Sequence, residues 1–245
     1  MRIVGTNFNL FYGKMEHRLL ASKVSSLLEK LGIEEDLVGI APLLTGGNNQ
    51  VFTAEGKSGK YFVKVYYQDD LHDRLESESQ FIKYAKHVGL ECVPDLLNFN
   101  TELGIGIFTF IEGNKLTSDD LTSGYIQQAA TFIKKLNENP DRDRTLPIAS
   151  DGCFNISGHM SRVDERLKLL SQISMDSALD REARTLVSTI EVEWESIKQE
   201  LISTGAIDDQ DLAWNNRCIS PSDFGFHNTL LQPSGNLCFL DFEYA

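Results

Sequence analysis

Residues 220–245 read SPSDFGFHNTLLQPSGNLCFLDFEYA, and this stretch has the pattern of a loop followed by a β-hairpin. Two short apolar runs, 229–231 and 237–240, flank the sequence QPSGN, in which proline and glycine favour a chain reversal. Because a hairpin brings its two ends together, we expect Asp241 to return close to Asn228 and to the loop that carries Asp223.

These three residues supply two carboxylates and one carboxamide, which are oxygen ligands of the kind that Mg²⁺ prefers. At a kinase-like site, an Asp accepts the proton of the acceptor hydroxyl, and an Asn five residues later and a separate Asp hold the metal. The spacing of Asp223, Asn228 and Asp241 matches that arrangement. The alternative is that Asp223 and Asn228 cap turns, as both residue types often do. The upstream sequence has to decide between the two.

The composition limits the class of protein. Of 245 residues, 41% are hydrophobic and 24% are charged, which is ordinary for a globular chain. A net charge of −13 and a pI of about 4.8 disfavour a nucleic-acid partner, which needs a basic surface. No apolar run approaches the roughly 20 residues that span a bilayer, so no membrane partner is expected. The four cysteines lack metal-ligand spacing, and we expect reduced thiols in a cytoplasmic protein.

The first half of the chain predicts a helix and then a sheet. Apolar residues recur at helical spacing between Glu16 and Leu31. Five strands are then predicted, at 40–44, 51–55, 60–66, 92–99 and 104–111. A second helix is predicted at 70–88, between the third and the fourth of these strands. This order predicts a five-stranded antiparallel sheet with one major helix. In the turn after the first strand, Gly46, Gly47 and Asn48 allow backbone N–H groups to approach an anion closely.

Lys64 interrupts the apolar run of the third predicted strand. An ammonium group at a buried position needs an acidic partner, whereas strand alternation would turn an unburied lysine to solvent. The helix that follows offers two partners, Glu76 and Glu78. We prefer Glu78, because it immediately precedes the apolar end of that helix, but the spacing alone leaves both candidates open.

The second half of the chain is predominantly helical. After residues 112–114, strand patterns are absent until the closing hairpin, and helices are predicted at 118–137, 160–171 and 179–203. We therefore place a lobe boundary between residues 111 and 112. Residues 1–111 form the predicted N-terminal lobe, and residues 112–245 form the C-terminal lobe with the loop of Asp223.

From about Leu43 to its end, the chain resembles the aminoglycoside phosphotransferase and choline kinase family, which has a protein-kinase-like fold. The motifs that carry the resemblance occur in the family's order, and they are the glycine turn 45–50, Lys64, the helix glutamate, Phe110-Ile111-Glu112-Gly113, Asp223-x-x-x-x-Asn228 and Asp241-Phe242-Glu243.

The resemblance implies an α+β, protein-kinase-like bilobal fold, with an N-lobe antiparallel β-sheet carrying one major helix and a mostly helical C-lobe carrying a catalytic β-hairpin. ATP would lie between the lobes. The resemblance also implies a role for each candidate residue: Gly46, Gly47 and Asn48 near the phosphates, Lys64 on the α- and β-phosphates with Glu78 orienting it, the backbone of Thr109, Phe110 and Ile111 on the adenine, Asp223 as the base, and Asn228 and Asp241 as Mg²⁺ ligands.

The predicted function is ATP-dependent transfer of the γ-phosphate to a hydroxyl of a small molecule, such as an amino alcohol, a sugar or an aminoglycoside. The chain departs from the family in three ways, and two of them, Pro221 and the missing C-terminal segment, favour an alternative, a kinase-like nucleotide-binding or regulatory protein with little or no turnover. Pro221 replaces the usual loop histidine, and Leu136-Asn137 replaces a Leu-His pair. The family also continues well past Asp241, so we expect a chain that is incomplete at its C-terminal end.

Overall fold

The structure is a computed structural model that describes residues 14–30, 37–43, 49–57, 59–67, 73–139, 145–207 and 209–245, without the side chains of 14–18. The chain divides into two compact units. One, the core unit, comprises the described residues from Lys14 to Ser150 and Ile219–Ala245, and the other, the helical unit, comprises the described residues of Asp151–Cys218. The lobe boundary at residues 111 and 112 stays a prediction.

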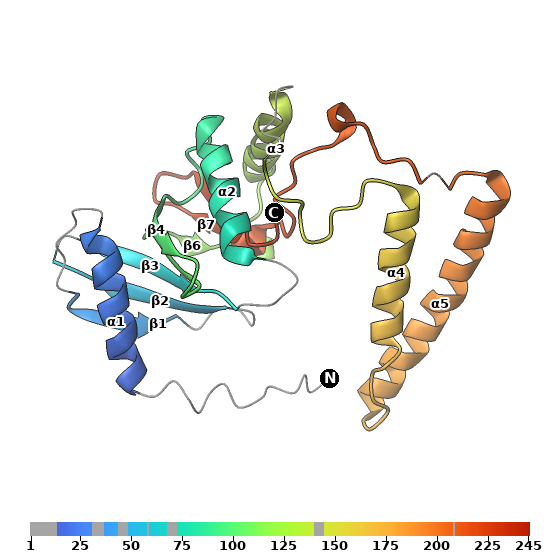
Figure 1. The fold of residues 1–245 in the computed structure, drawn as a ribbon, viewed down its shortest axis with the longest axis horizontal. Coiled ribbons are helices and arrows are strands. Elements are labelled where there is room, and N and C mark those ends of the chain that lie inside the picture. Colours follow the sequence, from blue (N-terminus) through green and yellow to red (C-terminus); the bar gives the residue numbers. More distant parts are fainter. Residues whose placement is uncertain are drawn as a thin grey trace. The chain divides into compact units, whose positions relative to one another are not determined.

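The N-terminal part of the core unit is a five-stranded sheet with two helices (Figure 1). Its elements are α1 (Lys14–Glu29), β1 (Gly39–Pro42), β2 (Gln50–Glu55), β3 (Lys60–Val65), α2 (Arg74–His87), β4 (Leu96–Asn100) and β5 (Ile105–Thr109). The strands lie in the order β1-β2-β3-β5-β4, and every neighbouring pair is antiparallel. The predicted five-stranded antiparallel sheet is therefore confirmed.

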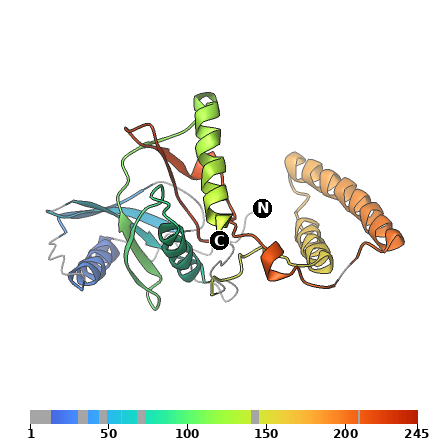
Figure 2. The ribbon, with the colours of Figure 1, turned by 90° about the horizontal axis from the view of Figure 1, so that it is seen from above.

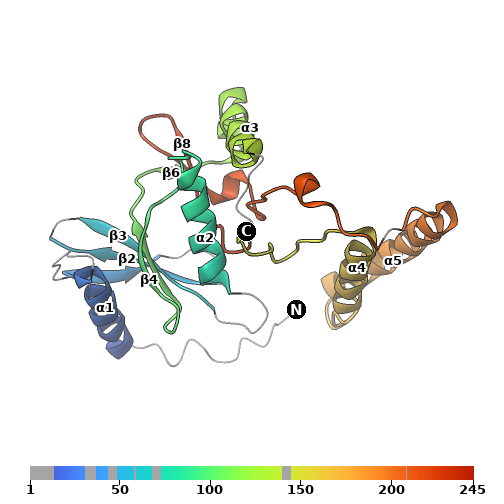
Figure 3. The same ribbon diagram turned by 45° about the horizontal axis from the view of Figure 1, so that its top comes forward.

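The rest of the core unit is a second small sheet beside a helix (Figure 3). It consists of β6 (Asn114–Lys115), η2 (Ser118–Asp120), α3 (Ser123–Glu138), η4 (Phe226–Asn228), β7 (Thr229–Leu231) and β8 (Leu237–Phe239). Strands β7 and β8 form the predicted hairpin. The expectation that no strand lies between residues 112–114 and this hairpin is wrong, because β6 pairs with β7. Two residues are too short to show an alternating pattern.

Helix α3 begins at Ser123, five residues later than predicted. The Thr122 side chain accepts a hydrogen bond from the backbone N–H of Tyr125 and so caps the helix. On the next turns of α3, Gln128 reaches the β7–β8 hairpin. Its Oε1 accepts a bond from Leu237 N at 2.9 Å, and its Nε2 donates to Gly235 O at 3.4 Å.

The helical unit consists of two helices that lie side by side (Figure 2). They are α4 (Ile156–Leu170) and α5 (Ala178–Thr204), followed by the short η3 (Trp214–Asn216), which confirms the two predicted helices. Asp164 of α4 joins them by accepting hydrogen bonds from Trp194 Nε1 at 2.8 Å and Lys198 Nζ at 3.0 Å. No helix within the described residues is long and apolar enough to cross a membrane.

Strand β3 separates two hydrophobic clusters of the core unit. Tyr61 and Val63 belong to the cluster that contains α1, whereas Phe62 and Tyr66 belong to the cluster that contains α2. Successive side chains of a strand point to opposite faces, so Lys64 lies on the same face as Phe62 and Tyr66. The reading of Lys64 as a solvent-facing residue is therefore wrong, and the residue is only 4% exposed.

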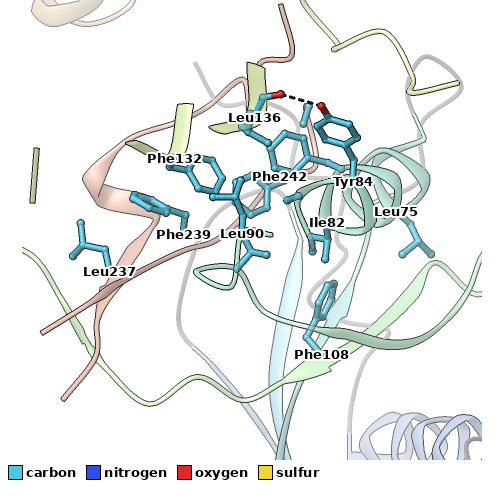
Figure 4. Close-up of a cluster of buried hydrophobic side chains, with 14 of the residues drawn as sticks. Leu75, Ile82, Tyr84, Leu90, Phe108, Phe132, Leu136, Leu237, Phe239 and Phe242 are labelled. Carbon is cyan, nitrogen blue, oxygen red and sulfur yellow. Dashed lines mark hydrogen bonds between the residues drawn. The ribbon is translucent and has the colours of Figure 1, made fainter. Parts of the chain in front are cut away.

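The α2 cluster also contains α3 and the closing hairpin (Figure 4). Phe242 stacks on Phe81 of α2 with ring centroids 4.5 Å apart, and it lies near Phe132 of α3 at 6.1 Å. The Tyr84 hydroxyl donates a hydrogen bond to Leu136 O at 3.0 Å, which joins α2 to α3. This packing fixes the backbone on either side of Asp241.

Candidate active site

Lys64 is the centre of a buried cluster of charged groups. Its Nζ lies 2.8 Å from Glu78 Oε2, 2.5 Å from Asp241 Oδ1 and 2.9 Å from Glu243 Oε2. In β5, the Cα partner of Lys64 is Gly106. A Cβ at Gly106 would lie 2.9 Å from the Phe108 ring, so a larger residue there would disturb the packing.

The charge of Lys64 is set by its three carboxylate neighbours. Burial acts to lower the pKa of its ammonium group, but Glu78, Asp241 and Glu243 outweigh burial and hold the pKa above its ordinary value. Lys64 is therefore charged over the whole physiological range. A charged lysine at the end of a pocket is suited to binding an anion.

Glu78, rather than Glu76, is the partner of Lys64. Glu78 lies on the buried face of α2, and its second oxygen accepts a hydrogen bond from the backbone N–H of Phe242 at 3.2 Å. Glu76 instead accepts a bond from Gln80 on the outer side of the helix. The carboxylate of Glu78 thus fixes Lys64 and the turn after Asp241 at the same time.

Tyr66 adds a neutral donor to this cluster. Its hydroxyl donates to Glu78 Oε2 at 2.6 Å, and its ring lies 4.8 Å from the Lys64 ammonium. Burial, and then the charge of Glu78, hold the pKa of Tyr66 well above its ordinary value. The hydroxyl therefore stays protonated and keeps donating.

Glu243 is a member of the site to which the sequence assigned no role, although it belongs to the Asp241-Phe242-Glu243 motif. It is 1% exposed and forms a salt bridge with Arg74 Nη1 at 3.1 Å, in addition to its contact with Lys64. Asn49 donates its side-chain amide to Glu243 and accepts a bond from the backbone N–H of Tyr67 at 3.0 Å. The only signal in the sequence was an acidic residue two positions after Asp241. Its partners are 169 and 194 residues away, which no local pattern shows.

The loop of Asp223 is held by contacts on both of its sides. On one side, Asn137 of α3 accepts a hydrogen bond from Ile219 N at 2.8 Å and donates one to Ile219 O at 3.0 Å. On the other, the Ser222 hydroxyl donates to Tyr244 O at 2.6 Å. Between these anchors Pro221 is buried. Of the two residues that depart from the family pattern, Asn137 therefore anchors the loop, and Pro221 is buried within it.

Two residues of the site adopt left-handed backbone conformations that side chains rarely adopt. Ser222 has a φ of 58° and Asp241 a φ of 67°. Such conformations persist only where the surroundings enforce them. For Ser222 this is the bond to Tyr244 O, and for Asp241 it is the flanking bond from Leu240 N to Asn228 O at 2.9 Å and the buried Phe242.

Asp223 and Asn228 are adjacent, as the sequence predicts. Asn228 Nδ2 donates to the backbone oxygen of Asp223 at 3.1 Å and lies 3.4 Å from its carboxylate Oδ2. With Nδ2 engaged in this way, the carboxamide oxygen is the atom that can face a cation. The backbone bond from Leu240 to Asn228 places Asp241 next to it.

Many of these residues line one pocket of about 540 Å³ in the core unit. Its charged and amide lining comes from Lys64, Glu78, Asp223, Asn228, Asp241 and Glu243, and its apolar lining from Leu43, Val51, Phe62, Pro94, Phe108, Leu230 and Leu240. Thr109, Phe110 and Ile111 also line the pocket, just where β5 ends. Phe62 pairs with Phe108 beside this strand end, whereas Lys64, two residues further along β3, contacts the carboxylates. The pocket therefore has an apolar end at Phe62 and Phe108 and an ionic end at Lys64.

The structure brings together most of the residues that the sequence singles out. Lys64, Glu78, Asp223, Asn228 and Asp241 share the ionic end, and residues 109–111 lie along the same pocket. The predicted phosphate-binding residues Gly46, Gly47 and Asn48 lie outside the described residues.

Comparison with solved structures identifies the fold. The streptomycin-ATP-APH(2")-IIa ternary complex is similar, with a TM-score of 0.55 and 17% sequence identity over 92% of this chain and 70% of that chain. Choline kinase LicA from Streptococcus pneumoniae is similar, with a TM-score of 0.55 and 20% identity over 92% and 69%. So is spectinomycin phosphotransferase APH(9)-Ia with ADP and spectinomycin, at 0.60 and 15% over 93% and 68%. The fold is therefore the α+β, protein-kinase-like fold that was expected.

Sequence comparison then shows the family. The phosphotransferase enzyme family, APH, matches residues 39–245. The chain belongs to this family, as the motifs indicated, and its members include small-molecule phosphotransferases. A search of curated proteins finds no match.

Proposed function

We propose that this protein transfers the γ-phosphate of ATP to a hydroxyl group of a small molecule, in the presence of Mg²⁺. The observation that carries the proposal is the position of Lys64. It is a buried, charged lysine at the ionic end of a pocket whose other end is apolar. A nucleotide has the same division, with an aromatic base at one end and a polyphosphate at the other.

The apolar end of the pocket fits an adenine ring. Phe62 lines this end on the same face of β3 as Lys64, so a base stacked on Phe62 would direct its phosphates toward the lysine. The pairing of β5 with β3 stops at Thr109. The backbone of Phe110 and Ile111, which lines the pocket beyond that point, would hydrogen-bond the edge of the base.

At the ionic end, the three carboxylates around Lys64 differ in how readily a phosphate would displace them. The side chains of Glu78 and Glu243 are 4% and 2% exposed, whereas that of Asp241 is 43% exposed. Glu78 and Glu243 are also bound to Phe242 N and Arg74. We therefore propose that the phosphates replace Asp241 as a partner of Lys64, while Glu78 and Glu243 keep the lysine in place.

The donor set beside Lys64 fits a magnesium ion. Asp241 offers an exposed carboxylate and Asn228 a carboxamide oxygen, both hard oxygen ligands. We propose that these two residues hold Mg²⁺ together with the phosphates. When bound, the ion would neutralise the charge of the β- and γ-phosphates.

Asp223 is the proposed base. Its carboxylate is 58% exposed at the pocket, so an acceptor hydroxyl can approach it. The acceptor O–H would give its proton to Asp223 while its oxygen forms a bond to the γ-phosphorus, and the bond from that phosphorus to the bridging oxygen would break to release ADP. Positioning would supply most of the rate enhancement. The acceptor would be an amino alcohol, a sugar or an aminoglycoside, in line with the choline, streptomycin and spectinomycin named for the similar structures.

The free thiols fit a cytoplasmic location, where ATP is available. All four cysteines, Cys92, Cys153, Cys218 and Cys238, are unpaired thiols. Burial raises the pKa of the Cys238 thiol to about 12, so this residue is an unreactive part of β8.

The test is release of ADP from Mg²⁺–ATP across a panel of hydroxyl acceptors, by wild type and Asp223→Asn. We expect Asp223→Asn to reduce turnover by roughly 10²–10⁴-fold, the usual contribution of a general base. Asp119→Asn, which makes the same chemical change at an exposed residue of η2, should leave turnover unchanged. Nucleotide binding without Asp223-dependent turnover would instead support a nucleotide-binding protein that does not catalyse transfer.

A further inference from the structure

The loop of Asp223 places an imidazole against the proposed base. Nε2 of His227 lies 3.2 Å from Oδ1 of Asp223. The other carboxylate oxygen, Oδ2, lies 3.4 Å from Nδ2 of Asn228. Each oxygen of Asp223 therefore has one side chain of η4 beside it.

The backbone leaves room for this imidazole at one glycine. A Cβ added to Gly225 would lie 2.7 Å from both Cε1 and Nδ1 of His227. Gly225 has an extended φ of −165°, so its backbone does not require glycine and the requirement is one of space. The oxygen of Gly225 accepts bonds from Asn228 N and the Thr229 hydroxyl, both at 3.1 Å, which hold it under the ring. Asp223, Gly225 and His227 thus form one local arrangement, in which the glycine leaves the space for the imidazole beside the carboxylate.

The contact between His227 and Asp223 is exposed to solvent at the wall of the pocket. The side chains of His227 and Asp223 are 63% and 58% exposed, and both line the pocket. A ring this exposed contributes little to the hydrophobic core, so packing alone gives no reason for its place. Its defined neighbour is the carboxylate that we propose to receive the acceptor's proton.

We propose that His227 is a positioning residue for Asp223, and this inference rests on the proposed function. The Nε2–H group donates to Oδ1 and fixes the carboxylate plane, so that Oδ2 is directed toward the acceptor hydroxyl. His227 neither takes up nor releases a proton in this role. His227, the residue before Asn228, would supply the hydrogen-bond donor that orients Asp223. Pro221 cannot supply one, because proline has no hydrogen-bond donor.

The kinetic test compares wild type with His227→Ala and His227→Gln, using ATP with its best acceptor or with water. His227→Ala should lower kcat roughly 10–100-fold, as loss of an orienting partner does, and leave KM for ATP unchanged. Glutamine can place its amide nitrogen where Nε2 lies, so His227→Gln should recover most of the rate. His87→Ala, at the exposed end of α2, is the matched control and should behave as wild type.

A double-mutant cycle separates positioning from other roles. Once Asp223 is replaced by Asn, His227→Ala should cause no further loss, because the residue acts through Asp223. An unchanged kcat in His227→Ala would overturn the proposal. So would a glutamine variant as slow as the alanine variant, or a change confined to KM for the acceptor.

One measurement does not depend on turnover. ¹⁵N NMR of the imidazole, at a pH where the ring is neutral, should show the Nε2–H tautomer in wild type and an altered Nε2 environment in Asp223→Asn. The Nδ1–H tautomer would overturn the proposal. A wild type without Asp223-dependent turnover would contradict the proposed function, whereas the tautomer would still decide whether His227 donates to Asp223.

Discussion

Lys64 and Asp223 line the same pocket but are held by different kinds of structure. Lys64 is 4% exposed and is surrounded by three carboxylates that belong to α2 and to the chain after β8. The Asp223 side chain is 58% exposed and lies on a loop that hydrogen bonds anchor at Ile219 and Ser222. Lys64 is part of the core, and Asp223 lies at its surface.

This difference separates stability from catalysis. A change in the Lys64 cluster removes a charge from a buried network and has to affect folding as well as nucleotide binding. A change at Asp223 exchanges a group that water already reaches, so it should affect the reaction alone. The proposed nucleotide half of the site is therefore built into the fold, and the acceptor half is not.

The largest expected effect is that of Lys64→Met. It leaves Glu78, Asp241 and Glu243, whose oxygens lie within 4.8 Å of one another, without their shared cation. Removing one partner of a buried ionic group costs about 3–5 kcal/mol, which we expect as the loss in the free energy of unfolding in urea. Lys60→Met, at a 55% exposed lysine of the same strand, should change that free energy by less than about 1 kcal/mol. Equal losses of unfolding free energy in Lys64→Met and Lys60→Met would contradict the difference between the buried lysine and the exposed one.

The second effect depends on pH. Tyr66→Phe removes the bond to Glu78, which we expect to cost about 1.5–3 kcal/mol at pH 7 because the acceptor is charged. The pKa of Tyr66 is raised in the folded protein, so its stabilisation is complete below the ordinary value of 10.0 and is lost as the pH rises above it. Urea unfolding at about pH 7 and about pH 11 should show the difference between wild type and variant shrinking. A difference that grows with pH would contradict this assignment.

A smaller loss of stability is expected on the other side of the comparison. Asn137→Ala removes both bonds to Ile219, and we expect a loss of about 1–2 kcal/mol. Turnover should fall roughly 10–100-fold, because Asp223 is displaced from its position. Gln127→Ala, at an exposed residue of α3, is the control. A change in nucleotide affinity without a change in turnover would contradict the role of Asn137 as an anchor of the loop.

Much of the fold follows from the sequence because its elements have clear periods. The apolar run of β3, the helical spacing of α2 and the turn between β7 and β8 are local signals. Strand β6 has only two residues and exists because β7 is there to pair with it. Helix α3 begins later than its pattern indicates because Thr122 caps it.

The candidate site divides in the same way. The spacing of Asp223, Asn228 and Asp241 could be read directly, since a hairpin joins them. The sequence left Glu76 and Glu78 open, and the choice depends on which side of α2 faces β3. Glu243 could not be assigned a role, because its importance lies in its contacts with Arg74 and Asn49, which depend on the whole tertiary structure.

The most direct test of a site in two halves is the affinity for Mg²⁺–ADP, measured by calorimetry at a temperature where each variant is folded. Lys64→Met should weaken binding roughly 10–100-fold, because a charge-assisted bond to phosphate is lost. Asp223→Asn should bind within about twofold of wild type while its turnover is lost. Wild-type affinity in Lys64→Met, or equal losses in both variants, would contradict the account.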